Sequence, residues 1–218
     1  MTPSALIEFE QVCFGYTPER QVFSGLSARV FPDERLGIIG PNGSGKTTFL
    51  HLLVGLLKPT AGTIRVFGKV RRSEQDFYEV RIRAGLVFQD ADDQLFCPTV
   101  LDDVAFGPLN LGKTAGKARE IALQTLAMLG IEDFAGRITY KLSYGEKRLV
   151  ALAAVLAMQP DMLLLDEPTN GLDDRSKQRL SEVLYTLPQT MILISHEQEF
   201  MQIHTTRTIR ITANGAFQ

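Results

Sequence analysis

A glycine-rich octapeptide at residues 40–47 restricts the local architecture more than any other segment of this chain. It reads Gly40-Pro41-Asn42-Gly43-Ser44-Gly45-Lys46-Thr47. The apolar run 36–39 before it predicts a buried strand, and residues 48–57 after it predict a helix. A loop of this composition between a buried strand and a helix is typical of α/β folds with parallel core strands. The octapeptide therefore predicts an α/β protein.

The residue types in this loop also indicate its ligand. Its glycines allow the backbone to curl so that several N–H groups point inward, and the following helix adds positive potential at its N-terminus. Lys46 would then reach the β- and γ-phosphates of a nucleotide, and the Thr47 hydroxyl would ligate Mg²⁺. We predict a P-loop that binds ATP and Mg²⁺ through residues 40–47 and Thr48. The alternative is a glycine-rich turn that only links the strand to the helix.

Composition limits the class of protein and its partners. The chain has 218 residues, 44% of them hydrophobic and 22% charged, which predicts one globular domain over residues 1–218. A net charge of -2 lacks the basic excess that nucleic-acid binding favours. Cys13 and Cys97 lie far apart without metal-ligand spacing, and we find no signal peptide or spanning run. We expect a cytosolic chain that can still dock on a membrane protein.

Apolar patterning predicts two kinds of sheet and a buried helix. Short β-branched segments separated by turn residues predict an antiparallel region near the N-terminus, at 6–10, 22–31 and 63–67. Nearly continuous apolar runs predict parallel core strands at 36–39, 86–88, 162–165 and 191–194. Helical periodicity is clear at 115–129 and 145–157, and the second of these is apolar almost all round. We expect that second helix to be buried.

Two carboxylates follow the predicted core strand at 162–165, as Asp166 and Glu167. This run fits a Walker B strand, whose acidic residue lies opposite the P-loop. Asp166 would help to hold Mg²⁺ through water, while Glu167, one residue further on, would polarise the attacking water as a general base. The alternative is an acidic loop that caps a core strand.

A third motif, Leu142-Ser143-Tyr144-Gly145-Glu146, comes just before the predicted buried helix. It resembles the LSGGQ signature of the ATP-binding cassette family, with Tyr144 in place of the first Gly and Glu146 in place of Gln. Ser143 has the character of an N-cap whose hydroxyl and following N–H groups can face a phosphate. The resemblance implies nucleotide contacts from Ser143, Gly145 and Glu146. Taken alone, the segment would be read as an ordinary N-cap.

Further segments resemble elements of the same family in the expected order. Gln89 resembles the Q-loop glutamine, which touches Mg²⁺ and water and reports the nucleotide state to the partner. Residues 170–173 resemble the D-loop, and His196 resembles the switch histidine near the γ-phosphate. Tyr16 lies where the family places an aromatic ring against adenine. A lone His, Gln or Tyr is usually structural, so these predictions depend on the order of the motifs.

The resemblance also implies a fold and partners. The family fold is a P-loop NTPase with a mixed core sheet, an N-terminal antiparallel β region and an inserted α-helical subdomain, here at about 90–160. In this family, the signature of one cassette closes over the nucleotide of another. The resemblance implies a second ATPase subunit, which we expect to be an identical chain. It also implies integral membrane coupling and substrate-binding subunits. We therefore expect a place on the cytoplasmic side of the membrane and no binding of nucleic acid. His51 and His204 lack motif context, and we predict structural roles for them.

The region after Gln89 is similar to one subgroup of cassettes. Residues 85–96, together with Thr99-Val100 and 103–112, look like the energy-coupling-factor importers, whose ATPases serve cobalt, nickel, biotin and other vitamins. Our first choice is a transition-metal importer, cobalt before nickel, with biotin or another vitamin next. The chain ends soon after the His196 region, and we expect it to lack the C-terminal extension of many relatives.

Two rival classes remain beside a transporter. The first is a soluble cassette ATPase that works on nucleic acid, ribosomes or cluster assembly. The span from Lys46 to Ser143 is too short for a long coiled-coil insertion, and a single cassette argues against tandem translation factors. The second is a metabolite kinase, which has no use for the signature motif.

Apolar side chains lie among acidic ones after Gln89, and this pattern predicts a docking surface for a membrane partner. We expect Leu95 and Phe96, in a loop, to form that surface. Val100, Val104 and Phe106 are expected to pack into the helical subdomain instead.

Overall fold

The structure is a computed structural model that describes residues 4–212. Within these residues the chain forms two compact units, one of residues 4–84 and 190–212 and the other of residues 85–189. The expected helical region at about 90–160 lies inside the second unit.

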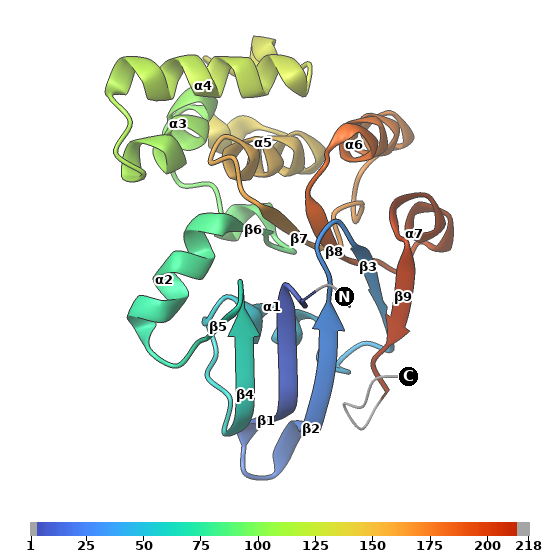
Figure 1. Ribbon diagram of the computed structural model, residues 1–218. Helices are drawn as coiled ribbons and strands as arrows, with labels where there is room; N and C mark the ends of the chain where they lie inside the picture. Colours follow the sequence, from blue (N-terminus) through green and yellow to red (C-terminus); the bar gives the residue numbers. More distant parts are fainter. Residues whose placement is uncertain (1–3, 213–218) are drawn as a thin grey trace. The chain divides into compact units, whose positions relative to one another are not determined.

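The first unit contains an antiparallel sheet with the strand order β2-β1-β4-β5 (Figure 1). Its strands are β1 (Ile7–Thr17), β2 (Arg20–Val30), β4 (Ala61–Val66) and β5 (Lys69–Val70). Residues 18–19 form the turn between β1 and β2, as the turn residues there predict. One face of β1 is buried, and Phe9 on that face stacks on Phe49 with ring centroids 4.5 Å apart. The predicted antiparallel region is therefore confirmed.

Parallel strands and three helices complete the first unit. The central strand β3 (Arg35–Ile39) pairs in parallel with β8 (Thr190–Ile194) on one side and β9 (Arg207–Arg210) on the other. The helices are α1 (Lys46–Leu53), α2 (Glu74–Arg83) and α7 (Gln198–His204). Because β3 ends directly before the octapeptide and α1 begins inside it, the predicted strand-loop-helix context is confirmed.

The helix after the octapeptide is shorter than the sequence predicts. It ends at Leu53 instead of continuing to residue 57. Gly55 takes a left-handed conformation with a φ of 75°, and a Cβ at this position would lie 2.2 Å from the Phe77 ring. Only glycine permits both the turn and this close approach of α2, so the chain leaves the helix here.

The second unit contains two core strands, four α-helices and three single turns of 3₁₀-helix. The strands β6 (Ala84–Val87) and β7 (Met162–Asp166) are neighbours, and all five residues of β7 are buried. The α-helices are α3 (Val100–Asn110), α4 (Ala115–Met128), α5 (Tyr144–Leu156) and α6 (Asp174–Thr186). Turns of 3₁₀-helix lie at 91–93, 132–134 and 139–141. Helices α3, α4 and α5 pack on one another (Figure 1), and α5 is buried along most of its length, as its apolar pattern predicts.

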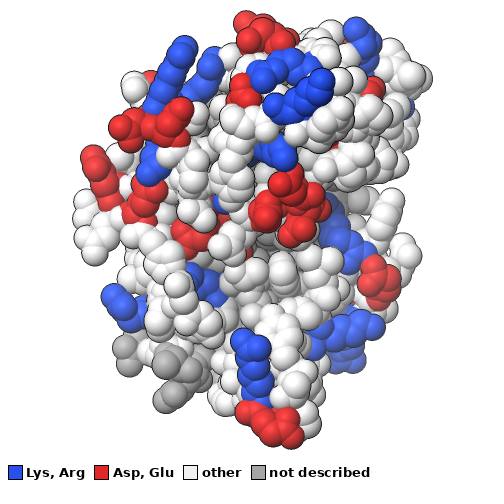
Figure 2. Space-filling view, turned by 180° about the vertical axis from the view of Figure 1, so that it is seen from behind, with Lys and Arg blue, Asp and Glu red and all other residues white. Residues whose placement is uncertain are grey.

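The surface carries both signs of charge. On the face drawn in Figure 2, basic and acidic side chains are interspersed and do not form one large area of a single sign. The described residues also form ion pairs, such as Arg207 with Glu34 at 2.5 Å and Lys69 with Glu79 at 3.1 Å. Exposed pairs of this kind each contribute at most about 1 kcal/mol to stability.

Candidate active site

The octapeptide folds as a tight loop that leads into α1. Gly45 forms the N-cap of α1 with a φ of 103°, in the left-handed region. A Cβ at this position would lie 2.6 Å from the Val22 side chain and 2.8 Å from the Phe23 ring. Glycine is therefore required here both for the backbone angle and for the close approach of β2.

Two polar side chains of this loop are buried. Lys46 is 8% exposed, and its ammonium donates to the carbonyl oxygens of Gly40 at 3.0 Å and Pro41 at 3.2 Å. The Ser44 hydroxyl is buried and has no hydrogen-bond partner among the residues that the structure describes. A buried charge held by neutral oxygens and a buried hydroxyl without a partner fit an anionic ligand, which would satisfy both groups. The N-terminus of α1 adds positive potential at the same place.

Tyr16 lies beside the first turn of α1. Its hydroxyl is 3.1 Å from the Thr48 hydroxyl, and its ring is 51% exposed. The Arg20 guanidinium lies 5.6 Å from the ring centroid. The first unit thus brings Tyr16 close to the start of α1, where the Thr48 hydroxyl forms a hydrogen bond with the Tyr16 hydroxyl. His196, in the same unit, is exposed and lies two residues after the end of β8.

The two carboxylates at the end of β7, Asp166 and Glu167, differ in environment. Asp166 is the last residue of the strand and is 2% exposed. Glu167 is half-buried and has a φ of 48°, which is uncommon for a residue other than glycine. Strained backbone of this kind costs about 1–3 kcal/mol and is concentrated at functional sites.

The signature segment forms the start of α5. Ser143 is the N-cap, and its hydroxyl oxygen accepts the Glu146 N–H at 3.3 Å. The Glu146 carboxylate in turn accepts the Ser143 N–H at 2.7 Å, which completes a capping box. Because the Ser143 hydroxyl acts as an acceptor in the cap, its own proton is available for a phosphate oxygen.

Sequence reasoning missed the partner of Glu146. The Arg137 guanidinium donates two hydrogen bonds to this carboxylate, of 2.7 and 3.2 Å. The Arg137 guanidinium holds the pKa of Glu146 below its ordinary value, and the Ser143 N–H acts in the same direction. No sequence signal marks Arg137, because it lies nine positions before Glu146 and outside the signature segment. The structure therefore gives Glu146 a capping and pairing role beside the predicted nucleotide contact.

The comparisons with known proteins assign the family. The model of the ABC transporter family matches residues 23–170. The chain belongs to this ABC transporter family. The fold expected from the P-loop and the signature, an antiparallel sheet, parallel strands and helices in an ABC ATPase, is confirmed. The chain is an ABC ATPase, the ATP-binding subunit of an ABC transporter.

Curated relatives agree with this assignment. An ABC transporter ATP-binding protein of Nitratidesulfovibrio vulgaris is 50% identical over 201 residues, which cover 92% of this chain and 74% of the relative. An uncharacterized ABC transporter ATP-binding protein of Haemophilus influenzae is 47% identical over 192 residues, 88% of either chain. Neither name gives a transported substrate.

Solved ABC structures are similar along nearly the whole chain. The cbiO1 protein of Clostridium perfringens, part of the ABC transporter complex cbiONQ, is 30% identical with a TM-score of 0.86, covering 98% of this chain and 87% of cbiO1. The dimeric ATP-binding cassette MJ0796 in a post-hydrolysis state, bound to ADP and Pi, is 26% identical with a TM-score of 0.88, covering 97% and 96%. Within residues 4–212 of this ABC ATPase, no helix has the length and apolar character needed to cross a membrane.

The predicted docking surface of the ABC ATPase is only partly as expected. Phe96 is 65% exposed and Leu95 is half-buried, while Val100 and Val104 are fully buried. Phe106 was expected in the core, and that prediction is wrong, because its side chain is 43% exposed. Its ring meets the Phe96 ring edge-on, with centroids 4.8 Å apart. The two exposed rings thus form one apolar surface on the second unit.

A buried carboxylate holds the loop that carries Phe96. Asp103 is 4% exposed, and one of its oxygens accepts the N–H groups of Phe96 at 3.0 Å and Cys97 at 2.9 Å. Its other oxygen accepts the Thr139 hydroxyl at 3.0 Å. Burial and the neighbouring Asp103 raise the pKa of the Cys97 thiol to about 11, so the thiol stays protonated at neutral pH.

Proposed function

We propose that this ABC ATPase works in head-to-tail pairs and drives uptake of a transition metal ion, cobalt first and nickel second, as part of an energy-coupling-factor importer. One observation supports nucleotide binding by the P-loop. The buried Lys46 ammonium contacts only neutral carbonyl oxygens among the described residues, and the buried Ser44 hydroxyl has no hydrogen-bond partner among them. The importer type is supported by the resemblance of residues 85–96 and by the similarity to cbiO1. Biotin or another vitamin is the alternative cargo, and a soluble cassette ATPase is the alternative class.

The residues predicted from the sequence motifs would hold the nucleotide. The phosphates would bind residues 40–47 and Thr48, with the Lys46 ammonium turning from the two carbonyl oxygens toward the β- and γ-phosphates. Adenine would stack on Tyr16, whose ring is exposed and fixed by its hydroxyl contact with Thr48. Glu167 would polarise the attacking water, and His196 would lie near the γ-phosphate.

Magnesium fits the donors that the chain offers. The Thr47 hydroxyl and the Gln89 amide oxygen would be hard oxygen ligands, which Mg²⁺ prefers, and the Asp166 carboxylate would help to hold the ion through water. Bound there, the ion would neutralise charge on the phosphates.

The second half of each site would come from a second copy of this chain. Ser143, Gly145 and the N-terminus of α5 would face the partner's γ-phosphate, with the Ser143 proton as donor. The membrane partners would be a coupling subunit and a substrate-binding subunit. The ATPase would then be a peripheral protein on the cytoplasmic side of the membrane.

The test is transport by a reconstituted complex. The chain is coexpressed with each membrane protein that sequencing finds encoded beside its gene, and any complex that copurifies is placed in vesicles with ATP. We expect ATP-dependent uptake of labelled Co²⁺ that is lost in Lys46→Ala, since this change should weaken ATP binding roughly ten- to a hundredfold. Uptake of biotin without Co²⁺ or Ni²⁺ would favour the vitamin alternative. Failure of any membrane protein to copurify would favour the soluble class.

A further inference from the structure

Tyr144 occupies the signature position where the resemblance expects glycine, and its side chain touches two other motif segments of the second unit. Its hydroxyl donates to the main-chain oxygen of Gln89 at 3.4 Å. Its ring lies over Gly171, where an added Cβ would be 2.6 Å from the ring atom Cε1. A glycine at position 144 could make neither contact.

Arg148, one turn further along α5, extends the same contacts. It is 3% exposed, and it donates to the Tyr144 hydroxyl at 3.0 Å and to the Phe88 carbonyl at 3.4 Å. It forms no ion pair with any residue that the structure describes. This buried cation therefore depends on neutral acceptors, and removing the Tyr144 hydroxyl would leave one of its donors without a partner.

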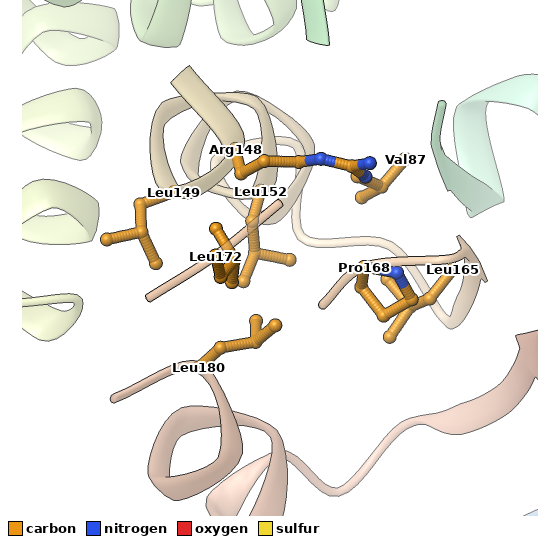
Figure 3. Close-up of a pocket in the computed structure, with 8 residues that line it drawn as sticks. All are labelled: Val87, Arg148, Leu149, Leu152, Leu165, Pro168, Leu172 and Leu180. Atoms are coloured by element: carbon orange, nitrogen blue, oxygen red, sulfur yellow. The ribbon is translucent and has the colours of Figure 1, made fainter. Parts of the chain in front are cut away.

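An apolar pocket beneath these contacts connects the same segments. Figure 3 shows Arg148 extending toward Val87, with Leu149, Leu152 and Leu172 around the pocket. Leu172 directly follows Gly171, and Val87 directly precedes Phe88. The segments before Gln89 and after Gly171 are thus packed against the same helix that carries Tyr144.

We propose that Tyr144 is a positioning residue that fixes the main chain at Gln89 and Gly171 to the first turn of α5. The three segments then shift together when nucleotide binds, so that a change at Gln89 reaches Ser143 through a short, fixed connection. The role of Gln89 and Ser143 in ATP hydrolysis rests on the proposed function, whereas the contacts themselves do not.

The test separates the hydroxyl from the ring. Tyr144→Phe removes the hydrogen bonds but keeps the ring over Gly171, and Tyr144→Gly removes both. Tyr140→Phe is the matched control, because Tyr140 is 74% exposed and lies in the turn just before the signature. Amide hydrogen exchange without nucleotide is measured first. We expect faster exchange at 88–90 in Tyr144→Phe, faster exchange also at 170–172 in Tyr144→Gly, and neither in the control.

Steady-state kinetics of ATP hydrolysis then test the consequence. We expect kcat to fall roughly tenfold in Tyr144→Phe and further in Tyr144→Gly, while the affinity of the isolated chain for ATP stays within about twofold. Unchanged exchange at 88–90 in Tyr144→Phe would overturn the proposal, as would a kcat within about twofold of wild type. A uniform rise in exchange along the chain would also overturn it, because the role would then be general stability. A wild-type chain without ATPase activity would contradict the proposed function and leave the exchange result as the test of the contacts.

Discussion

The stability of this ABC ATPase should fall in mild acid because of one buried histidine. His204, the last residue of α7, is 1% exposed, and its ring centroid lies 4.5 Å from that of Phe200. Burial, with a smaller contribution from the positive Arg35, lowers the pKa of His204 from 6.5 to about 4. Its structural role, expected from the absence of a motif around it, agrees with this burial.

The sign follows from the two pKa values. The unfolded chain binds a proton at position 204 near pH 6.5, whereas the folded chain binds it only near pH 4. Between these values the unfolded state holds more protons, so the free energy of unfolding decreases as the pH falls. The loss from this residue is about 2 kcal/mol between about pH 7.5 and 5, and approaches roughly 3 kcal/mol below about pH 4.

The measurement is urea unfolding followed by circular dichroism at several pH values. Wild type is compared with His204→Gln, whose side chain stays neutral, and with His51→Gln as a control for removing a histidine elsewhere. Carboxylates that titrate in the same range are common to all three proteins, so their effect cancels in the comparison. We expect His204→Gln to lose about 2 kcal/mol less than wild type on acidification. Equal losses in wild type and His204→Gln would refute the reasoning.

Three further predictions concern the catalytic cycle and the docking surface. The Glu167→Gln variant should still bind ATP, but its turnover should fall by a factor of roughly 10²–10⁴, so that an ATP-held dimer accumulates. A size-exclusion profile that stays monomeric at all concentrations would count against paired sites. Lys46→Ala mixed with Ser143→Arg should regain activity through the one intact site of the heterodimer, which a tagged pull-down verifies. If verified heterodimers gain nothing over either variant, the shared-site arrangement fails. Phe96→Asp should abolish ATP-driven transport in vesicles without weakening ATP binding, with the similarly exposed Tyr185→Asp as control. Intact transport in Phe96→Asp would place the docking surface elsewhere.

Local sequence signals predicted the parts of the fold that depend on neighbours in the chain. The strand before the octapeptide, the buried strand before Asp166 and the buried helix after Ser143 all follow from short apolar runs and N-cap chemistry. The end of α1 could not be predicted in this way. It depends on Gly55 meeting Phe77, which lies more than twenty residues further along the chain.

Contacts between distant segments account for the other differences. Phe106 shares the apolar pattern of α3 with Val100 and Val104, but only the packing of that helix decides which side chains are covered. The hydroxyl of Tyr144 reaches Gln89 across 55 positions of the sequence. Periodicity within one segment contains no information about such a contact. Sequence motifs therefore identified both residues, but they could not predict the hydrogen bond between them.

The substitution of Glu146 for the signature glutamine shows how a local change can be compensated at a distance. A free carboxylate at the third position of α5 would favour the cap but would also repel an anion approaching the same helix end. Arg137 pairs with both oxygens of this carboxylate, and the side chains are 40% and 28% exposed, so solvent weakens the residual field of the pair. The N-terminus of α5 therefore keeps its positive potential, and the Ser143 hydroxyl keeps the orientation that the capping box imposes. A phosphate can approach a helix start of this kind although its sequence carries an acid.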